Sequence, residues 1–189
     1  MGANSALIFG IIINVAILLV FFRFLMQLAS VSPYNPVVLS TVKATKIVDV
    51  FSRILPTLAK GRVNTAALAL LVVLYLLKIF GMMYLSGGMP NGPIHLVILT
   101  FVTMIQDLIR FCRYLIFATI ILSWVVMFTQ SRSPYIEVVQ ELAEPLLAPF
   151  RRIMPNIGMI DLSPILAILA LMVVDLIMRE VAMVLLTGF

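Results

Sequence analysis

The sequence predicts an all-α membrane protein with about four transmembrane helices. They are arranged as two parallel repeats, each a span, an interfacial amphipathic helix and a second span. Hydrophobic residues make up 63% of the 189 residues and charged residues only 11%, whereas soluble domains are about one-quarter charged. In addition, residues 48–66 align with 144–164, so that Phe51, Arg53 and Pro56 fall on Phe150, Arg152 and Pro155. We therefore place the first repeat at 1–92 and the second at 93–189.

The first span is expected at residues 6–29, where the apolar core is interrupted only by Asn14. Arg23 comes late enough in this run for its side chain to reach the headgroup region. Asn35 and Pro36 are typical of a helix start, because Asn caps free amide groups and Pro fits the first turn. A single amphipathic helix is expected over 37–55. Its apolar side holds Ala44, Ile47, Val48, Phe51, Ile54 and Leu55, and its polar side holds Thr45, Lys46, Asp49, Ser52 and Arg53.

The second span is expected at 63–85, with Asn64 or Thr65 as its cap, and the Gly- and Pro-rich stretch 86–93 is typical of a tight reversal. Residues 94–129 are too long for one perpendicular span. Two interpretations stay open for the first part, 94–109: a separate helix near the far surface, or an extension of a third span at 111–129.

The second link begins at Ser133 and Pro134, which repeat the cap-and-proline start. Along 135–154 the apolar residues Tyr135, Val139, Leu142, Leu146, Phe150 and Ile153 share one side of a helix, opposite Glu137, Gln140, Glu141, Glu144 and Arg151. We expect Pro145 and Pro149 to break or bend this helix, because neither can donate the helical hydrogen bond. The fourth span is expected from Ser163 and Pro164 to about residue 186.

The distribution of basic residues predicts the orientation. Both links are basic, whereas the N-terminal tail and the 86–93 loop hold no Lys or Arg; the link residues are Lys43, Lys46, Arg53, Lys60, Arg62, Arg132, Arg151 and Arg152. Positively charged loops stay in the cytoplasm. The links are therefore expected to face the cytoplasm, and both termini the periplasm.

Three stretches carry a resemblance to a known family. EPLLAPFRRIMPNIGMIDLSP at 144–164, preceded by SWVVMFTQSRSP at 123–134, is similar to the YggT family of small bacterial inner-membrane proteins, and RFLMQLASVSPYNP at 23–36 resembles the family's N-terminal unit. The first copy departs from the motif, because Lys46 stands where Pro145 does and Val50 where Pro149 does. The resemblance implies a multi-pass protein of the inner membrane. It also implies roles in membrane-protein assembly, cofactor attachment, plastid nucleoid or division organisation, or osmotic tolerance, with no shared reaction.

The motif positions Pro145, Pro149, Arg151, Arg152, Pro155, Asp161, Ser163 and Pro164 form the first candidate site. Arg151 and Arg152 could hold anionic lipid headgroups or an acidic segment of a partner, because guanidinium groups bind oxyanions bidentately. They could equally serve only to fix orientation and anchor the helix. Asp161 could pair with one of these arginines or cap the fourth span.

A second candidate set consists of charged residues within the expected spans: Lys78, Asp107, Arg110, Arg113, Asp175, Arg179 and Glu180. Ionisable groups at this depth are costly unless paired or hydrated. Asp175 and Arg179 are spaced to satisfy each other on one helix face. Structural pairing, an ion path and a partner-binding patch are the three interpretations.

No metal-ligand spacing, nucleotide-binding loop or nucleophile motif appears in the sequence. His95, the single histidine, is expected in a solvated loop. We expect no enzymatic activity and no cofactor, and a protein that organises partners or assists membrane assembly through its cytoplasmic helices. Anionic lipids and a membrane-protein partner or a second copy are the expected partners, without nucleic acid. The alternative is transport or ion handling linked to osmotic tolerance, and a lipid-modifying enzyme ranks third.

Overall fold

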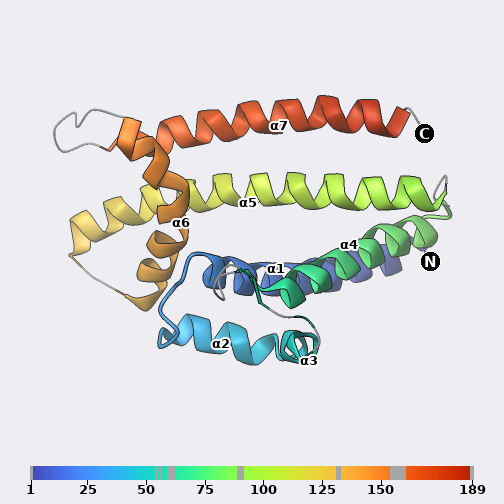
Figure 1. Cartoon of the computed structure of the whole chain (residues 1–189), viewed down its shortest axis with the longest axis horizontal. Coiled ribbons are helices and arrows are strands. Elements are labelled where there is room, and N and C mark those ends of the chain that lie inside the picture. Colours follow the sequence, from blue (N-terminus) through green and yellow to red (C-terminus); the bar gives the residue numbers. More distant parts are fainter. Residues whose placement is uncertain are drawn as a thin grey trace.

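The described part of the chain consists of helices. The computed structural model describes residues 2–53, 55, 57–58, 63–88, 92–130, 133–153 and 161–187. The helices are α1 (Gly2–Leu28), α2 (Pro36–Ala44), α3 (Ile47–Ser52), α4 (Thr65–Leu85), α5 (Pro93–Thr129), α6 (Pro134–Ile153) and α7 (Ser163–Thr187) (Figure 1). By length and composition, three of the described helices can cross a membrane: 4–28, 65–85 and 93–129. The chain is a membrane protein.

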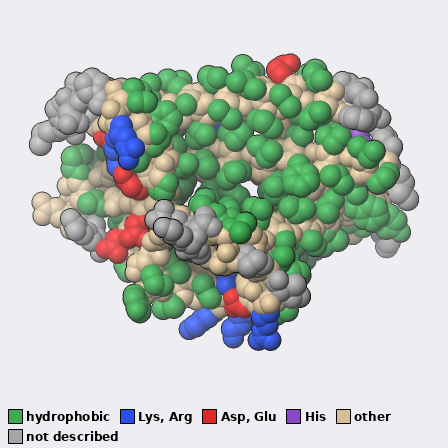
Figure 2. Space-filling view, viewed as in Figure 1, with side chains coloured by type: hydrophobic (Ala, Val, Ile, Leu, Met, Phe, Trp, Pro, Cys, Tyr) green, Lys and Arg blue, Asp and Glu red, His purple; other side chains and the backbone are tan. Residues whose placement is uncertain are grey.

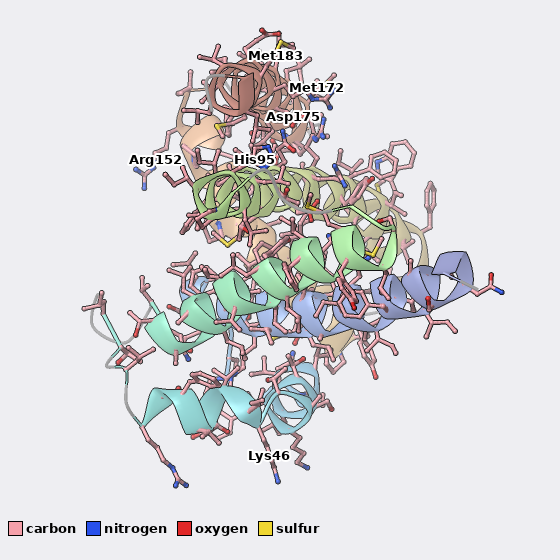
Figure 3. The ribbon with its side chains drawn as sticks, turned by 90° about the vertical axis from the view of Figure 1, so that its right-hand side faces the viewer. Lys46, His95, Arg152, Met172, Asp175 and Met183 are labelled. Carbon is pink, nitrogen blue, oxygen red and sulfur yellow. The ribbon has the colours of Figure 1, made fainter. Side chains whose placement is uncertain are left out.

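The long helices form two packed pairs, α1 with α4 and α5 with α7. Both chain ends and the turn between α4 and α5 lie at one end of the molecule, whereas α6 crosses the long helices near the other end (Figure 1). The pairs also cross each other. In the view that runs nearly along α5 and α7, α1 and α4 are seen obliquely from the side (Figure 3).

Short polar side chains fix the helix starts. Asn35 accepts a hydrogen bond from the Val37 amide at 2.9 Å, with Pro36 as the first residue of α2. Asn64 accepts one from the Ala67 amide at 2.9 Å at the start of α4, which confirms Asn64 as the cap. Its amide group also donates to Gln27 Oε1 at 3.0 Å and thereby ties α4 to the end of α1.

Two buried clusters hold the pairs together. The first joins α1 to α4 and α3 through side chains such as Phe21, Leu71 and Val48. The second joins α5, α6 and α7 to the end of α1 through Ile116, Leu147 and other apolar residues. Many further large apolar side chains point outward from the long helices (Figure 2), as expected of a surface that faces lipid.

The first link differs from the expected single helix over 37–55. It contains two helices, α2 and α3, and the chain turns at Thr45 and Lys46 between them. Thr45, assigned above to the polar side, is buried, whereas Ala44 and Ile47, assigned to the apolar side, are exposed. The reason lies outside the link: Arg23 Nη1 donates to the Thr45 carbonyl at 2.8 Å and to its hydroxyl at 3.2 Å.

Of the two interpretations of residues 94–109, the extension is confirmed, because α5 runs unbroken for 37 residues. Such a helix is about 55 Å long, well beyond the roughly 30 Å of the hydrocarbon core. It must therefore tilt or project beyond the hydrocarbon. His95 accordingly lies in the first turn of α5 and not in a loop; its Nδ1 is buried and has no hydrogen-bond partner among the described residues.

The second link is one helix. Of the break or bend expected at Pro145 and Pro149, the break does not occur, because α6 continues through both residues. Both prolines lie on its exposed side, where solvent can satisfy the carbonyl groups that lose their helical partner. The buried side consists of Val138, Leu142, Ala143 and Leu147, and Val139, Leu146 and Phe150 of the expected apolar face are partly buried against the same cluster. Tyr135 and Ile153, which belong to that face, are 71% and 76% exposed.

Candidate functional site

The outer face of α6 is charged. Its exposed residues include Glu137, Gln140, Glu141, Glu144, Arg151 and Arg152, and they form a band of charge beside the apolar long helices (Figure 2). The opposite side packs into the second cluster, against α5, α7 and the end of α1. Arg151 and Arg152 fall in the last turn of α6, where positive charge is favoured by the helix dipole. The fold thus presents this face outward on a helix that is fixed from behind.

The two arginines of the motif have different surroundings. Arg151 bridges α6 and α7, because it forms ion pairs with Glu144 and, through Nε, with Asp161 at 3.0 Å. Asp161 in turn accepts a hydrogen bond from the Ser163 amide at 2.9 Å, so pairing and capping, the two alternatives for Asp161, both occur. Arg152 makes no ion pair or hydrogen bond with any described residue and points away from the helices (Figure 3). It is the arginine left to bind a ligand.

The remaining described residues of the motif lie at a helix start or within a helix. Ser163 and Pro164 begin α7, and Pro145 and Pro149 lie within α6 on its exposed side. Pro155 lies outside the described residues. The proline ring has no hydrogen-bond donor or acceptor, so the described prolines of the motif, Pro145, Pro149 and Pro164, can act only by shaping the link.

The bridge to Arg151 affects the protonation of Asp161. Partial burial opposes the charged form, but hydrogen bonds from the Ser163 side chain and backbone, followed by the hydrogen bond and charge of Arg151, lower the pKa of Asp161 below its ordinary value. A carboxylate with a lowered pKa stabilises the folded state above its unfolded pKa, and this stabilisation is lost as the pH falls through the folded value.

Replacing Asp161 with Asn is therefore expected to have a pH-dependent effect. Asn still caps α7 but cannot pair with Arg151. The variant should unfold at a lower temperature than the wild type at neutral pH, and the difference should vanish as the pH falls through the lowered pKa of Asp161. Because Asp161 is 46% exposed, the effect should stay within about 1 kcal/mol. Thermal unfolding in detergent across this pH range measures it, and a difference that does not change with pH would contradict the assignment.

A first cluster of charged side chains lies in the middle of the long helices. Asp107 of α5 contacts Lys78 of α4 at 3.4 Å and Arg110 of its own helix at 3.2 Å. Tyr75, which the sequence did not single out, donates its hydroxyl to Asp107 at 3.1 Å, and the Lys78 ammonium lies 5.3 Å from the centre of the Tyr75 ring. These groups line a cavity of about 430 Å³ between α1, α4 and α5.

A second cluster joins α5 to α7. Asp175 accepts hydrogen bonds from Arg113 at 3.1 Å and from Arg179 at 3.0 Å, and only 6% of Asp175 is exposed. The expected contact between Asp175 and Arg179 is confirmed, and Arg113 is the partner that spacing along one helix cannot indicate. Glu180 is exposed and makes no ion pair with the described residues. Structural pairing fits this cluster best.

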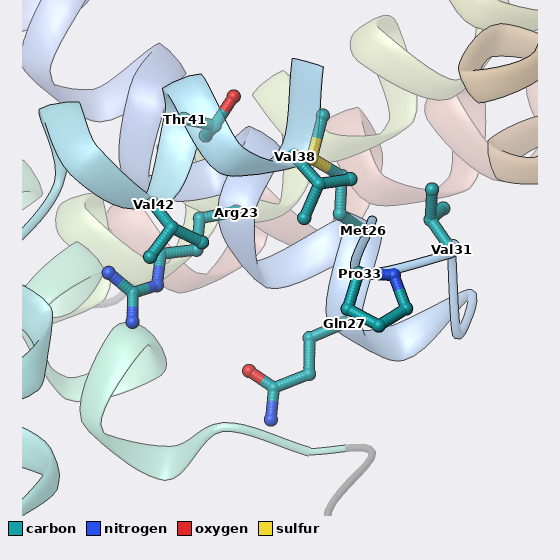
Figure 4. Close-up of a pocket in the computed structure, with 8 residues that line it drawn as sticks. All are labelled: Arg23, Met26, Gln27, Val31, Pro33, Val38, Thr41 and Val42. Atoms are coloured by element: carbon teal, nitrogen blue, oxygen red, sulfur yellow. The ribbon is translucent and has the colours of Figure 1, made fainter. Parts of the chain in front are cut away.

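A further ion pair, which the sequence did not predict, lies between α1 and α3. Arg23, expected to reach the headgroups, turns toward α3 and pairs with Asp49. It also forms one edge of a pocket of about 180 Å³ between α1 and α2, with Gln27, Val38, Thr41 and Val42 (Figure 4). The pocket walls are mostly apolar and Arg23 is already paired, so this pocket has no free charged group.

No group of three or more His, Cys, Asp or Glu side chains within the described ranges is placed to hold a metal ion. Cys112, the single cysteine, is buried in α5. Among the described residues, three features can contact a polar ligand: the outer face of α6, the cavity beside Asp107, and the exposed Lys43, Lys46 and Arg53 of the first link.

Comparisons with known proteins agree with the motif. The family model described as CCB3/YggT matches residues 98–182, which include most of α5, all of α6 and most of α7. An uncharacterized protein of Pseudomonas aeruginosa, PA0392, is 32% identical over 93% of this chain and 89% of its own length. The uncharacterized protein YggT of Escherichia coli K12 is 32% identical over 90% of this chain and 86% of its own length.

A further relative is an uncharacterized protein in the proC 3′ region of Vibrio alginolyticus, 30% identical over 96% of both chains. No solved structure matches this chain with significance. The matches cover the whole architecture and not only the motif of the second half. The chain belongs to the CCB3/YggT family.

Proposed function

We propose that this chain is a non-enzymatic protein of the bacterial inner membrane that docks partner proteins on the outer face of α6 and so organises or assists membrane assembly. The observation that carries the proposal is Arg152, which pairs with no described residue and lies on a charged face whose helix is packed from behind by Val138, Leu142, Ala143 and Leu147. A rigid, preorganised surface loses little entropy on binding. A guanidinium group that pairs with no described residue fits an acidic segment of another protein.

The proposed topology places this face in the cytoplasm. α7 has 25 residues, enough to cross the hydrocarbon core, and its buried Asp175 is paired, which supports it as a fourth span. The four spans would then form two like-oriented units, with residues 1–92 and 93–189 as repeats. In support, both units consist of an antiparallel helix pair joined by a link that begins with a capping residue and proline. The positive charge of the links favours the cytoplasm.

The two links would have different partners. Three exposed basic residues lie on the first link: Lys43 in α2, Lys46 at the turn before α3 and Arg53 directly after α3. Positive side chains gather at this edge of the molecule (Figure 2). Lys46 points away from the helices (Figure 3). A basic edge beside a membrane attracts anionic lipid headgroups, at about 1 kcal/mol per charge. We assign lipid contact to this first link and protein contact to α6, in keeping with their different forms.

The docking proposal predicts that Arg152→Glu abolishes partner capture. Arg151→Glu should have the same result but also breaks the bridge to Asp161, so Arg152 is the cleaner position. The measurement is crosslinking and pull-down of the full chain from native membranes in mild detergent, comparing wild type, Arg152→Glu and the double variant Arg151→Glu with Arg152→Glu. Lys46→Glu is the matched control, because it makes the same charge change on the other link. Unchanged partners in both arginine variants would contradict the proposal.

Ion handling between the two helix pairs is the second candidate function. The cluster at Asp175 argues against a path there, because this carboxylate is buried and both of its contacts are cations of the protein itself. The specific observation in favour is the cavity at Asp107, which lies between the first pair and α5. Ion flux in proteoliposomes that depends on Asp107 and not on Asp175 would favour this function over docking.

A further inference from the structure

We propose that the cavity between α1, α4 and α5 is a binding site for a small monovalent anion such as chloride. The cavity is lined by Asn14, Tyr75, Lys78, Asp107 and Arg110 among apolar residues and has a volume of about 430 Å³. This inference goes beyond partner docking, since it concerns a different surface from α6.

The site lies deep within the helices. Asn14 is near the middle of α1, and Tyr75 is the middle residue of α4. Lys78 is seven residues from the end of α4 at Leu85, about 10 Å along the axis, and Arg110 is close to the centre of α5. A charged group at this depth in a membrane is not fully compensated by water, so the balance of charge within the cavity decides what it attracts.

That balance is positive. Lys78 and Arg110 share the single carboxylate of Asp107, so two cations and one anion leave one positive charge. Both oxygens of Asp107 are occupied, because Oδ1 contacts Arg110 while Oδ2 contacts Lys78 and the Tyr75 hydroxyl. The Arg110 side chain is 54% exposed. Some of its five N–H donors therefore remain free for another acceptor. This arrangement of charges and free donors favours binding of an anion over binding of a cation.

Asn14 supplies an independent observation. Its side chain makes no hydrogen bond with any described residue, although it interrupts an apolar span and lines the cavity. An amide group without a partner in an apolar environment costs free energy. It can donate two hydrogen bonds to a ligand, and so it adds neutral donors to the two cations.

The remaining walls favour a small ion. Ile17, Leu18, Phe21 and Phe111 are apolar. The Phe21 and Phe111 rings pack edge to face at 5.2 Å, and Phe22 packs on Phe111 at 5.9 Å. Tyr114 completes the lining. Walls of this kind add no further charge to the cavity.

The test is equilibrium binding of radioactive chloride to the full chain in detergent, with thermal unfolding in sodium chloride and in sodium gluconate of equal ionic strength. Wild type should bind chloride saturably and unfold at a higher temperature in chloride, because a ligand of the folded state stabilises it. Arg110→Gln and Asn14→Leu should weaken binding, the first by about tenfold or more. Asp107→Asn should strengthen it, because two cations then face the ion. A merely structural role of Asp107 predicts no such gain.

The controls separate this site from other effects. Arg179→Gln removes a cation of the other cluster and should leave chloride binding unchanged, as should Arg152→Glu on α6. Because Asn14 pairs with no described residue, its variant stays informative if Arg110→Gln fails to fold. Equal behaviour in chloride and gluconate, or binding retained in both cavity variants, overturns the proposal. A third outcome also overturns it: protein that copurifies with a membrane partner shows no response to chloride. In that case a carboxylate of the partner would be the anion that faces the cavity.

Discussion

Replacing Asp175 with Leu is expected to destabilise the protein by about 3 kcal/mol, because it leaves the partly buried Arg113 without its carboxylate partner. Arg113 and Arg179 both donate to this carboxylate, but their side chains differ in exposure, at 25% and 65%. Arg179 can turn outward when Asp175 is lost, whereas Arg113 stays between α5 and α7. Unfolding of the purified protein in mixed micelles with increasing dodecyl sulfate measures the loss.

A double variant distinguishes this cause from general damage to α7. Adding Arg113→Met to Asp175→Leu removes the unpaired cation and should restore most of the stability, to within about 1 kcal/mol of wild type. Glu180→Leu is the matched control, because this carboxylate is on the same helix but exposed. A similar loss in Glu180→Leu, or no recovery in the double variant, would show that the cluster does not hold α7 to α5.

Replacing Leu147 with Ala should loosen α6 from the helices behind it. Leu147 is 1% exposed and belongs to the cluster that joins α5, α6 and α7, and buried leucine-to-alanine changes cost about 2–5 kcal/mol. Leu146 is its neighbour and only partly buried, so Leu146→Ala is the matched control and should cost much less. Limited proteolysis of α6 in detergent measures the difference, and partner capture should fall with Leu147→Ala although every charged residue remains.

Equal sensitivity of the two variants would mean that the partly buried Leu146, which packs against the same cluster, holds α6 as firmly as Leu147. No loss in either variant would remove the physical basis of a rigid docking surface.

The sequence was sufficient where local chemistry decides the structure. Asn64 was one of two predicted caps and accepts a hydrogen bond from the Ala67 amide. Residues 94–129 were recognised as too long for one perpendicular span, and of the two alternatives for 94–109 the unbroken α5 confirms the extension. These features depend on hydrogen-bond donors and helix length, which neighbouring residues fix. The expected i, i+4 contact from Asp175 to Arg179 has the same origin.

The features that the sequence did not predict depend on distant residues. The turn at Thr45 coincides with hydrogen bonds from Arg23, 22 residues earlier, and Arg113 meets Asp175 across 62 residues. The buried side of α6 is set by its neighbours in the bundle, so periodicity predicted Leu142 but not Val138, Ala143 and Leu147. The cavity combines three helices, and Tyr75 joins it only because α4 and α5 lie side by side.

Site-directed labelling with a membrane-impermeant maleimide tests the placement of α6 at the cytoplasmic surface most directly. In a Cys112→Ala background, Gln140→Cys reports on the outer face of α6 and Ser86→Cys on the turn at the opposite end; both positions are exposed. We expect position 86 to be labelled in intact spheroplasts, and position 140 to be labelled only in inverted vesicles or permeabilised cells. Labelling of position 140 from outside would place α6 in the periplasm, and the docking role proposed for it would then be wrong.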